Sequence, residues 1–172
     1  EKYGVEPPRS IVLFGPPGTG KTTFAKAVAS RLHWPFVEVF PARLAGDAKG
    51  LAAGLRDTFT RIEDLDNVVV FIDEVEEIAA QRGGEPPTAL QGVTNELLKL
   101  IPMFRERPGR LLIVATNFIR ALDDAFLRHG RFDYVIPIGL PDTGARESIW
   151  TRYIPSHALK NVDLKELVKR TE

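Results

Sequence analysis

Residues 15–22, GPPGTGKT, match the pattern G-x-x-x-x-G-K-[ST], in which glycine, lysine and a hydroxyl side chain occupy fixed positions. The match follows a short apolar run at 10–14 and opens a helical pattern. In that context the glycines let backbone N–H groups face a polyphosphate, and the start of the helix adds a favourable dipole. The segment therefore predicts a strand, a phosphate-binding loop and a helix in direct succession.

The loop residues predicted to surround the phosphates are Gly15, Pro16, Pro17, Gly18, Thr19, Gly20, Lys21, Thr22 and Thr23. Lys21 should reach the β- and γ-phosphates, and Thr22 should give its hydroxyl oxygen to Mg²⁺. One alternative is a glycine-rich turn without a ligand. Another is the start of a dinucleotide-binding G-x-G-x-x-G, which is weaker because Thr23 stands where the last glycine or alanine belongs.

Runs rich in β-branched residues alternate with helical patterns along the chain, at 10–14, 35–40, 67–72, 110–116 and 134–139. Such alternation predicts an α/β fold with a five-stranded parallel sheet and helices on both faces. The segments 68–72 and 111–115 are apolar without alternation, so these strands should lie in the middle of the sheet. Helices are predicted after 20, over 51–62 and 90–104, near Ala121, after the N-cap Asp142, and after a capping box of Asp163 and Glu166.

The apolar strand at 68–72 runs into two carboxylates, Asp73 and Glu74. Asp73 fits a Mg²⁺-holding role, acting on the metal directly or through its water shell. Glu74 is then placed to orient and deprotonate an attacking water. The alternative is that both side chains cap the next helix, whose Glu76 and Glu77 are interpreted as a solvated face.

The composition excludes several classes of protein. The 172 residues carry 23 basic and 23 acidic side chains, so no domain-wide positive field favours nucleic acid. The chain has no cysteine for disulfides or thiolate chemistry, and no apolar run approaches the ~20 residues of a membrane span. His33, His129 and His157 lack zinc-site spacing. Between 105 and 131 the sequence has six arginines and three carboxylates, a local excess of positive charge. This excess favours a subunit interface, with a nucleic-acid groove as the alternative.

Four segments of the sequence resemble the AAA subgroup of the AAA+ ATPases, the group of valosin-containing protein, katanin, the proteasomal ATPases and the FtsH-type proteases. These are residues 7–9 leading into the phosphate loop, 71–74, 115–117 and 122–133. The resemblance implies Mg²⁺-dependent ATP hydrolysis, and the absence of an N-K-x-D run agrees with ATP over GTP. It also implies that Asn117 contacts the γ-phosphate or the water, and that Arg128 and Arg131 are arginine fingers for a neighbouring subunit.

The same resemblance implies a P-loop NTPase sandwich at 1–141 that binds the nucleotide, and at 142–172 the beginning of a small helical lid. It implies a homo-oligomeric ring, hexameric in the full-length protein, that remodels or unfolds a protein partner. A cytoplasmic location is expected, although the sequence itself does not determine the compartment. Neither a nucleic-acid partner nor a transmembrane segment is expected. The chain is expected to be a piece of something longer.

Two positions depart from the family pattern. Asp47 stands where threading members carry an aromatic pore residue, and Pro102 with Met103 replaces an Asp-Gly pair. A hydrated carboxylate does not grip an unfolded chain as a ring does, so threading through a pore is not expected. Two further functions stay open: a nucleotide-binding assembly module with slow hydrolysis, and a nucleic-acid motor or loader.

Overall fold

The computed structural model describes residues 7–41, 50–79, 88–122, 124–128, 130–160 and 162–171. Within these ranges five strands form one parallel sheet in the order β2-β3-β4-β1-β5. The strands are β1 (Ser10–Phe14), β2 (Phe36–Val39), β3 (Val68–Ile72), β4 (Arg110–Thr116) and β5 (Tyr134–Pro137). The helices beside them are α1 (Lys21–Leu32), α3 (Leu51–Ile62), α4 (Glu76–Ala79) and α5 (Thr88–Glu106). The predicted parallel sheet, with β3 and β4 inside it, is confirmed.

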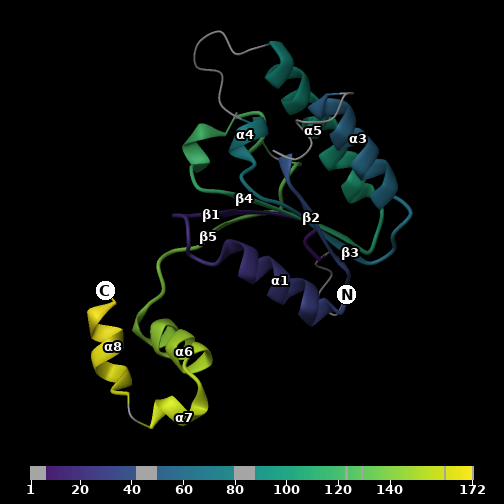
Figure 1. Cartoon of the computed structure of the whole chain (residues 1–172). Helices are drawn as coiled ribbons and strands as arrows, with labels where there is room; N and C mark the ends of the chain where they lie inside the picture. The colour runs from purple at the N-terminus through teal and green to yellow at the C-terminus, as the bar shows by residue number, and fades with distance from the viewer. Residues whose placement is uncertain are drawn as a thin grey trace. The chain divides into compact units, whose positions relative to one another are not determined.

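Alternate residues of the inner strands face opposite helical layers. Phe71 of β3 packs in one cluster with Ala25 of α1, whereas Ile72 packs in the other with side chains of α3 and α5. Figure 1 shows α1 on one side of the sheet and α3 and α5 on the other. Because both faces are covered, the inner strands need apolar residues on both faces, and β3 is apolar throughout while β4 is apolar at every position between Arg110 and Thr116.

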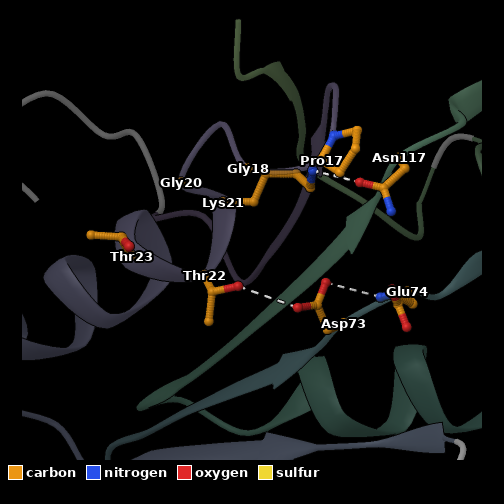
Figure 2. A pocket seen from close by; sticks show the side chains of 9 residues that line it. All are labelled: Pro17, Gly18, Gly20, Lys21, Thr22, Thr23, Asp73, Glu74 and Asn117. Atoms are coloured by element: carbon orange, nitrogen blue, oxygen red, sulfur yellow. Dashed lines mark hydrogen bonds between the residues drawn. The ribbon is translucent and has the colours of Figure 1, made fainter. Parts of the chain in front are cut away.

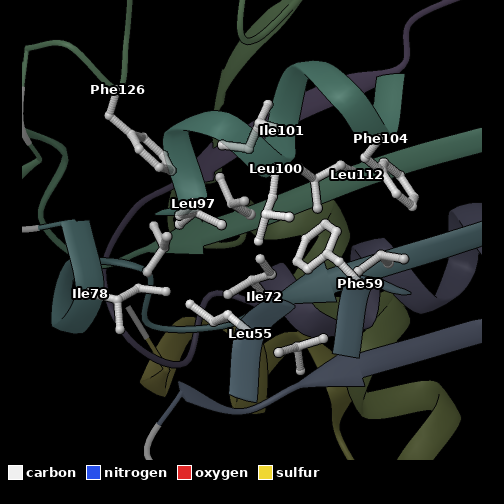
Figure 3. Close-up of a cluster of buried hydrophobic side chains, with 14 of the residues drawn as sticks. Leu55, Phe59, Ile72, Ile78, Leu97, Leu100, Ile101, Phe104, Leu112 and Phe126 are labelled. Carbon is white, nitrogen blue, oxygen red and sulfur yellow. The ribbon is translucent and has the colours of Figure 1, made fainter. Parts of the chain in front are cut away.

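The larger of the two clusters lies between α3, α5 and the sheet (Figure 3). Leu55 and Phe59 of α3 share it with Leu97, Ile101 and Phe104 of α5. The rings of Phe59 and Phe104 lie edge to face with their centroids 5.7 Å apart, an arrangement that aromatic pairs prefer. Burying an apolar side chain of this size contributes about 1.5–3 kcal/mol, so this cluster fixes α5 firmly against the sheet.

The helix predicted near Ala121 is not found among the described residues there. They form one 3-10 turn, η1 (Ile119–Ala121), and residues 124–128 form turns and bends. Leu122 and Phe126 are nevertheless buried in the larger cluster, and the ring of Phe126 lies 5.1 Å from that of Phe132. Two buried side chains four residues apart imitate a helical period, but here an irregular segment places them in the core.

The chain divides into two compact units, Glu1–Ile138 and Gly139–Glu172. The second contains α6 (Thr143–Tyr153), α7 (Ser156–Leu159) and α8 (Leu164–Arg170). Both predicted N-caps are confirmed: Asp142 Oδ1 accepts from Ala145 N at 2.8 Å, and Asp163 Oδ1 accepts from Glu166 N at 3.2 Å. The capping box is only half formed, because the Glu166 carboxylate pairs with Arg170 at 2.8 Å. No described helix is long and apolar enough to cross a bilayer.

Candidate functional site

The phosphate loop connects the end of β1 to the start of α1. Gly18 and Gly20 have φ angles of 79° and 93°, in the left-handed region that glycine adopts without a steric penalty. Gly15 is required for a different reason, since a Cβ atom on it would lie 2.0 Å from the carbonyl oxygen of Ile138. Gly15 N also donates to Thr116 O at 3.2 Å. The loop is therefore seated between the ends of β4 and β5.

Lys21, the first residue of α1, is only 7% exposed. Its ammonium donates to the carbonyl oxygens of Gly15 at 2.8 Å and Pro16 at 3.0 Å, and to Asn117 Oδ1 at 2.8 Å. A buried ammonium is tolerated only when its donors are paired. The lysine thus connects the phosphate loop to Asn117, which directly follows β4.

Thr22 and Asp73 meet across the same cleft. The hydroxyl of Thr22 donates to Asp73 Oδ2 at 3.2 Å, and Asp73 Oδ1 accepts from Glu74 N at 3.0 Å. A hydroxyl and a carboxylate at this separation are hard oxygen ligands of the kind that Mg²⁺ takes, with waters and substrate phosphates completing its shell. The described residues hold no cluster of three or more His, Cys, Asp or Glu that could bind a metal alone. The Thr22–Asp73 pair offers two oxygen ligands of the kind that Mg²⁺ takes.

Glu74 lies just beyond β3 with its side chain exposed. Its φ of 50° is in the left-handed region, which costs a non-glycine residue about 1–2 kcal/mol. Two hydrogen bonds hold this conformation. Glu74 N donates to Asp73 Oδ1, and Glu77 N donates to Glu74 O at 2.9 Å. Strain retained at one residue beside a cleft is common at functional sites.

These side chains line one cleft of about 350 Å³ (Figure 2). It combines the loop, the carboxylates that follow β3 and the amide that follows β4, at the carboxyl edge of the sheet. The residues that line it are Pro17, Gly18, Gly20, Lys21, Thr22, Thr23, Asp73, Glu74 and Asn117. All of them are candidates from the sequence. Thr19 belongs to the same loop, where its hydroxyl donates to Pro16 O at 2.9 Å.

Glu76 was not recognised as part of the site from the sequence. The interpretation of Glu76 as a solvated residue is wrong, because its Oε1 accepts from Asn117 N at 3.0 Å and its Oε2 is buried without a partner among the described residues. Glu77 is exposed, as expected. Val75 N donates to Ala115 O at 3.0 Å, so the turn after β3 is fastened to the end of β4 at two points. No local pattern in the sequence signals this contact, because it joins positions 41 residues apart.

Arg128 and Arg131 lie away from this cleft. The carbonyl oxygen of Arg131 accepts from the hydroxyl of Ser10 at 2.8 Å, and Ser10 begins β1, whereas the phosphate loop follows its other end, at Phe14. At about 3.3 Å per residue, β1 separates the two by about 13 Å. Arg128 is exposed, and Arg131 is half-buried with its Nη1 unpaired among the described residues.

The remaining candidates fall outside the cleft or outside the described ranges. Asp47 and His129 lie outside the described residues. Pro102 and Met103 lie within α5, and the Met103 side chain is 55% exposed.

A family comparison decides what kind of protein carries this cleft. The model of the family described as "ATPase family associated with various cellular activities (AAA)" matches residues 11–140, from β1 to just past β5. The chain belongs to the AAA family of ATPases. The match contains the sheet except for Ser10, the first residue of β1, together with the phosphate loop, Asp73, Glu74, Asn117 and the segment of Arg128 and Arg131.

Individual AAA relatives align over nearly the whole chain. Proteasome-activating nucleotidases of Methanococcus maripaludis strain C7 and of Methanospirillum hungatei JF-1 are 39% and 40% identical to it over 100% of its length. The ATP-dependent zinc metalloprotease FtsH of Rhodococcus erythropolis is 37% identical over 99% of it. The chain spans 43% of each nucleotidase and 21% of the protease. It is thus similar to the ATPase portion of longer proteins.

Proposed function

We propose that this AAA module hydrolyses ATP with Mg²⁺ in the cleft around Lys21, and that a second copy of the chain completes the site with Arg128 and Arg131. One observation carries the proposal. The bonds from Lys21 to Asn117 and from Thr22 to Asp73 draw the phosphate loop and the ends of β3 and β4 into one cleft. Phosphoryl transfer is catalysed mainly by such positioning and by charge stabilisation.

Each cleft residue has a distinct task in this proposal. The loop N–H groups and Lys21 hold the triphosphate, while Thr22 and Asp73 hold Mg²⁺, directly or through water. Bound Mg²⁺ supplies positive charge beside the phosphate oxygens. Glu74 orients the attacking water and accepts its proton, and Asn117 holds the water or the γ-phosphate by its side-chain amide.

The position of Arg131 supports action on another copy. Its segment adjoins the start of β1, whereas the chain's own phosphate loop follows the end of that strand. A guanidinium delivered into a water-poor interface stabilises charge on the transferring phosphoryl group. Arginines supplied in this way contribute about 10³-fold or more to turnover.

Two substitutions test the assignment in the full-length protein. Glu74→Gln should retain ATP and lose hydrolysis, because the amide no longer accepts the proton of the water. Arg131→Ala should keep ATP affinity and lose about 10³-fold in turnover. Glu77→Gln, an exposed neighbour, is the control and should behave as wild type. Normal turnover in both site variants would contradict the proposal.

For the whole protein, we propose a ring, hexameric as the family resemblance implies, that couples hydrolysis to remodelling of a protein partner. The support is the similarity to proteins named for proteasome activation and ATP-dependent proteolysis. Action in the cytoplasm stays a prediction. A second candidate is an assembly module with slow hydrolysis, which Pro102 and Met103 favour because they replace the Asp-Gly pair. ATP-driven unfolding of a tagged protein would exclude it, and ATP-dependent assembly without stimulated turnover would support it.

A further inference from the structure

Arg105, in the last turn of α5, bonds to the chain on both sides of Arg131, to a backbone carbonyl before it and to a side chain after it. Its Nη1 donates to the carbonyl oxygen of Gly130, and its Nη2 forms an ion pair with Asp133 Oδ1. The side chain is only 18% exposed. A planar guanidinium can donate to two acceptors at once in a fixed geometry. Arg105 therefore fixes the residue before Arg131 and the second residue after it.

Ser10 and Asp133 complete this attachment. Asp133 Oδ2 accepts from Arg9 N at 2.8 Å, from Ser10 N at 3.0 Å and from Ser10 Oγ at 3.2 Å. The same hydroxyl donates to Arg131 O at 2.8 Å, and Asp133 N donates to Ser10 O at 3.0 Å. Ser10 is fully buried. The segment that carries Arg131 is thus fastened to α5 by Arg105 and to β1 by Ser10.

The attachment lies far from the chain's own cleft. Arg105 also accepts, through its backbone carbonyl, a bond of 2.8 Å from Arg9 Nη1, so every partner in this network adjoins the start of β1. The cleft lies at the carboxyl edge of the sheet. A change at Arg105 should therefore leave the chain's own nucleotide contacts intact and disturb only the segment that carries Arg131.

We propose that Arg105 is a positioning residue for the finger Arg131, so that its effect on hydrolysis is felt in the neighbouring copy and not in its own. The inference rests on the proposed trans role of Arg131. A side chain that must reach a phosphoryl group across an interface loses effectiveness when its backbone is free to move, and a displacement of 1 Å can cost about 10²-fold in rate. Arg105 limits that movement from inside the donating copy.

The test mixes two defective forms of the full-length protein. Arg105→Leu has an intact cleft and a loosened finger, whereas Glu74→Gln has an intact finger and an inactive cleft. Alone, Arg105→Leu should lose roughly 10- to 100-fold in kcat, with its affinity for ATP nearly unchanged. Mixed at equal amounts, the two should hydrolyse ATP faster than the sum of the separate forms. Retained ATP affinity shows that the core of Arg105→Leu is folded.

Three further forms make the result interpretable. Arg107→Leu is the matched control, because Arg107 is an exposed neighbour that donates to Glu63 O at 3.2 Å, and it should keep wild-type turnover. Arg105→Lys keeps the positive charge but lacks the planar guanidinium that donates to two acceptors, so its turnover should lie between those of wild type and Arg105→Leu. Arg131→Ala mixed with Glu74→Gln tests the finger itself.

Each contrary result has its own meaning. Suppose that mixing with Glu74→Gln restores the turnover of Arg131→Ala. If Arg105→Leu then keeps full turnover alone, or if mixing does not restore its turnover, the role of Arg105 is overturned and the proposed function stands. If Arg131→Ala is not restored by mixing, the trans finger is overturned, and the role of Arg105 with it. If Arg105→Leu fails to fold, the same two outcomes are read from Arg105→Lys.

Discussion

At the scale of single residues, Glu76 connects the carboxylate pair to Asn117. One of its oxygens accepts the backbone N–H of Asn117, whose side chain accepts from Lys21. The other oxygen is buried without a partner among the described residues. A buried carboxylate is costly unless it is paired, and the hydrogen bond of this carboxylate goes to Asn117, the residue proposed to contact the γ-phosphate or the water. Glu76 therefore sets the position of Asn117 relative to Glu74.

Replacing Glu76 should slow hydrolysis without weakening ATP binding in proportion. Loss of a hydrogen bond to a charged group corresponds to about 1.5–3 kcal/mol, or roughly 10- to 100-fold in kcat. We expect that loss for Glu76→Ala in steady-state kinetics, with partial rescue in Glu76→Gln, which keeps an acceptor. Glu77→Ala is the control, since Glu77 is exposed. Equal kcat in the Glu76→Ala and Glu77→Ala variants would contradict this role.

Most of the cleft could be predicted from sequence, because its residues directly follow strands. Parallel strands end at one edge of the sheet, so residues after β1, β3 and β4 must meet there. Glu76 could not be found in this way, because its role depends on how a four-residue helix packs against the end of β4. The bonds of Arg105 to Gly130 and Asp133 join positions 25 and 28 residues apart, and no local pattern indicates them.

At the scale of elements, α5 depends on its contact with α3 and the sheet. Leu97 is fully buried in the larger cluster, so Leu97→Ala removes apolar contact and leaves a cavity. We expect a loss of about 2–5 kcal/mol in the free energy of unfolding, measured by urea denaturation. Lys99→Ala, on the exposed side of the same helix, should change it by less than about 0.5 kcal/mol. Similar losses in the two variants would show that α5 is not held by this face.

An ion pair between α3 and α5 should make stability depend on pH. The side-chain hydrogen bond from Arg56 to Glu96, 2.8 Å long, lowers the pKa of Glu96 below its ordinary 4.5. The carboxylate's contribution is thus fully present above pH 4.5 and disappears as the pH falls through the lowered pKa. Melting temperatures of wild type and Arg56→Leu should therefore converge in acid, whereas Arg61→Leu should show no such convergence. A gap between wild type and Arg56→Leu that persists below that pKa would contradict this.

The elements themselves were predictable where burial is regular. β3 is apolar throughout, and β4 is apolar between Arg110 and Thr116, because helices cover both faces. The apolar residues of α3 have the spacing of one buried side. The segment after η1 was not predictable, because Leu122 and Phe126 are buried by an irregular backbone whose course is set by the surrounding core. The spacing of apolar residues indicates which side chains are buried. Only in regular helices and strands does it also indicate the conformation of the backbone.

At the scale of the whole molecule, the proposed role of Arg131 predicts that activity depends on association, because the segment that carries it lies away from the chain's own cleft. If Arg128 and Arg131 complete the cleft of a neighbouring copy, as proposed, a lone copy of the full-length protein has a cleft without these arginines. We expect turnover per copy to rise with protein concentration and then to level off, as measured by phosphate release over a dilution series. Arg131→Ala should give low turnover that does not change with concentration. Constant turnover per copy in the wild type, down to concentrations where sedimentation shows single copies, would contradict this.

The cleft and the segment of Arg131 lie at opposite ends of β1, and this placement also limits how many complete clefts an assembly of copies can have. If each subunit gives its arginines in one direction and receives them from the other, as proposed, an open row of subunits leaves one terminal cleft incomplete. Only a closed circle makes complete clefts equal in number to subunits. Closure of the ring would then complete the terminal cleft and raise its ATP turnover, with no new contact inside any chain.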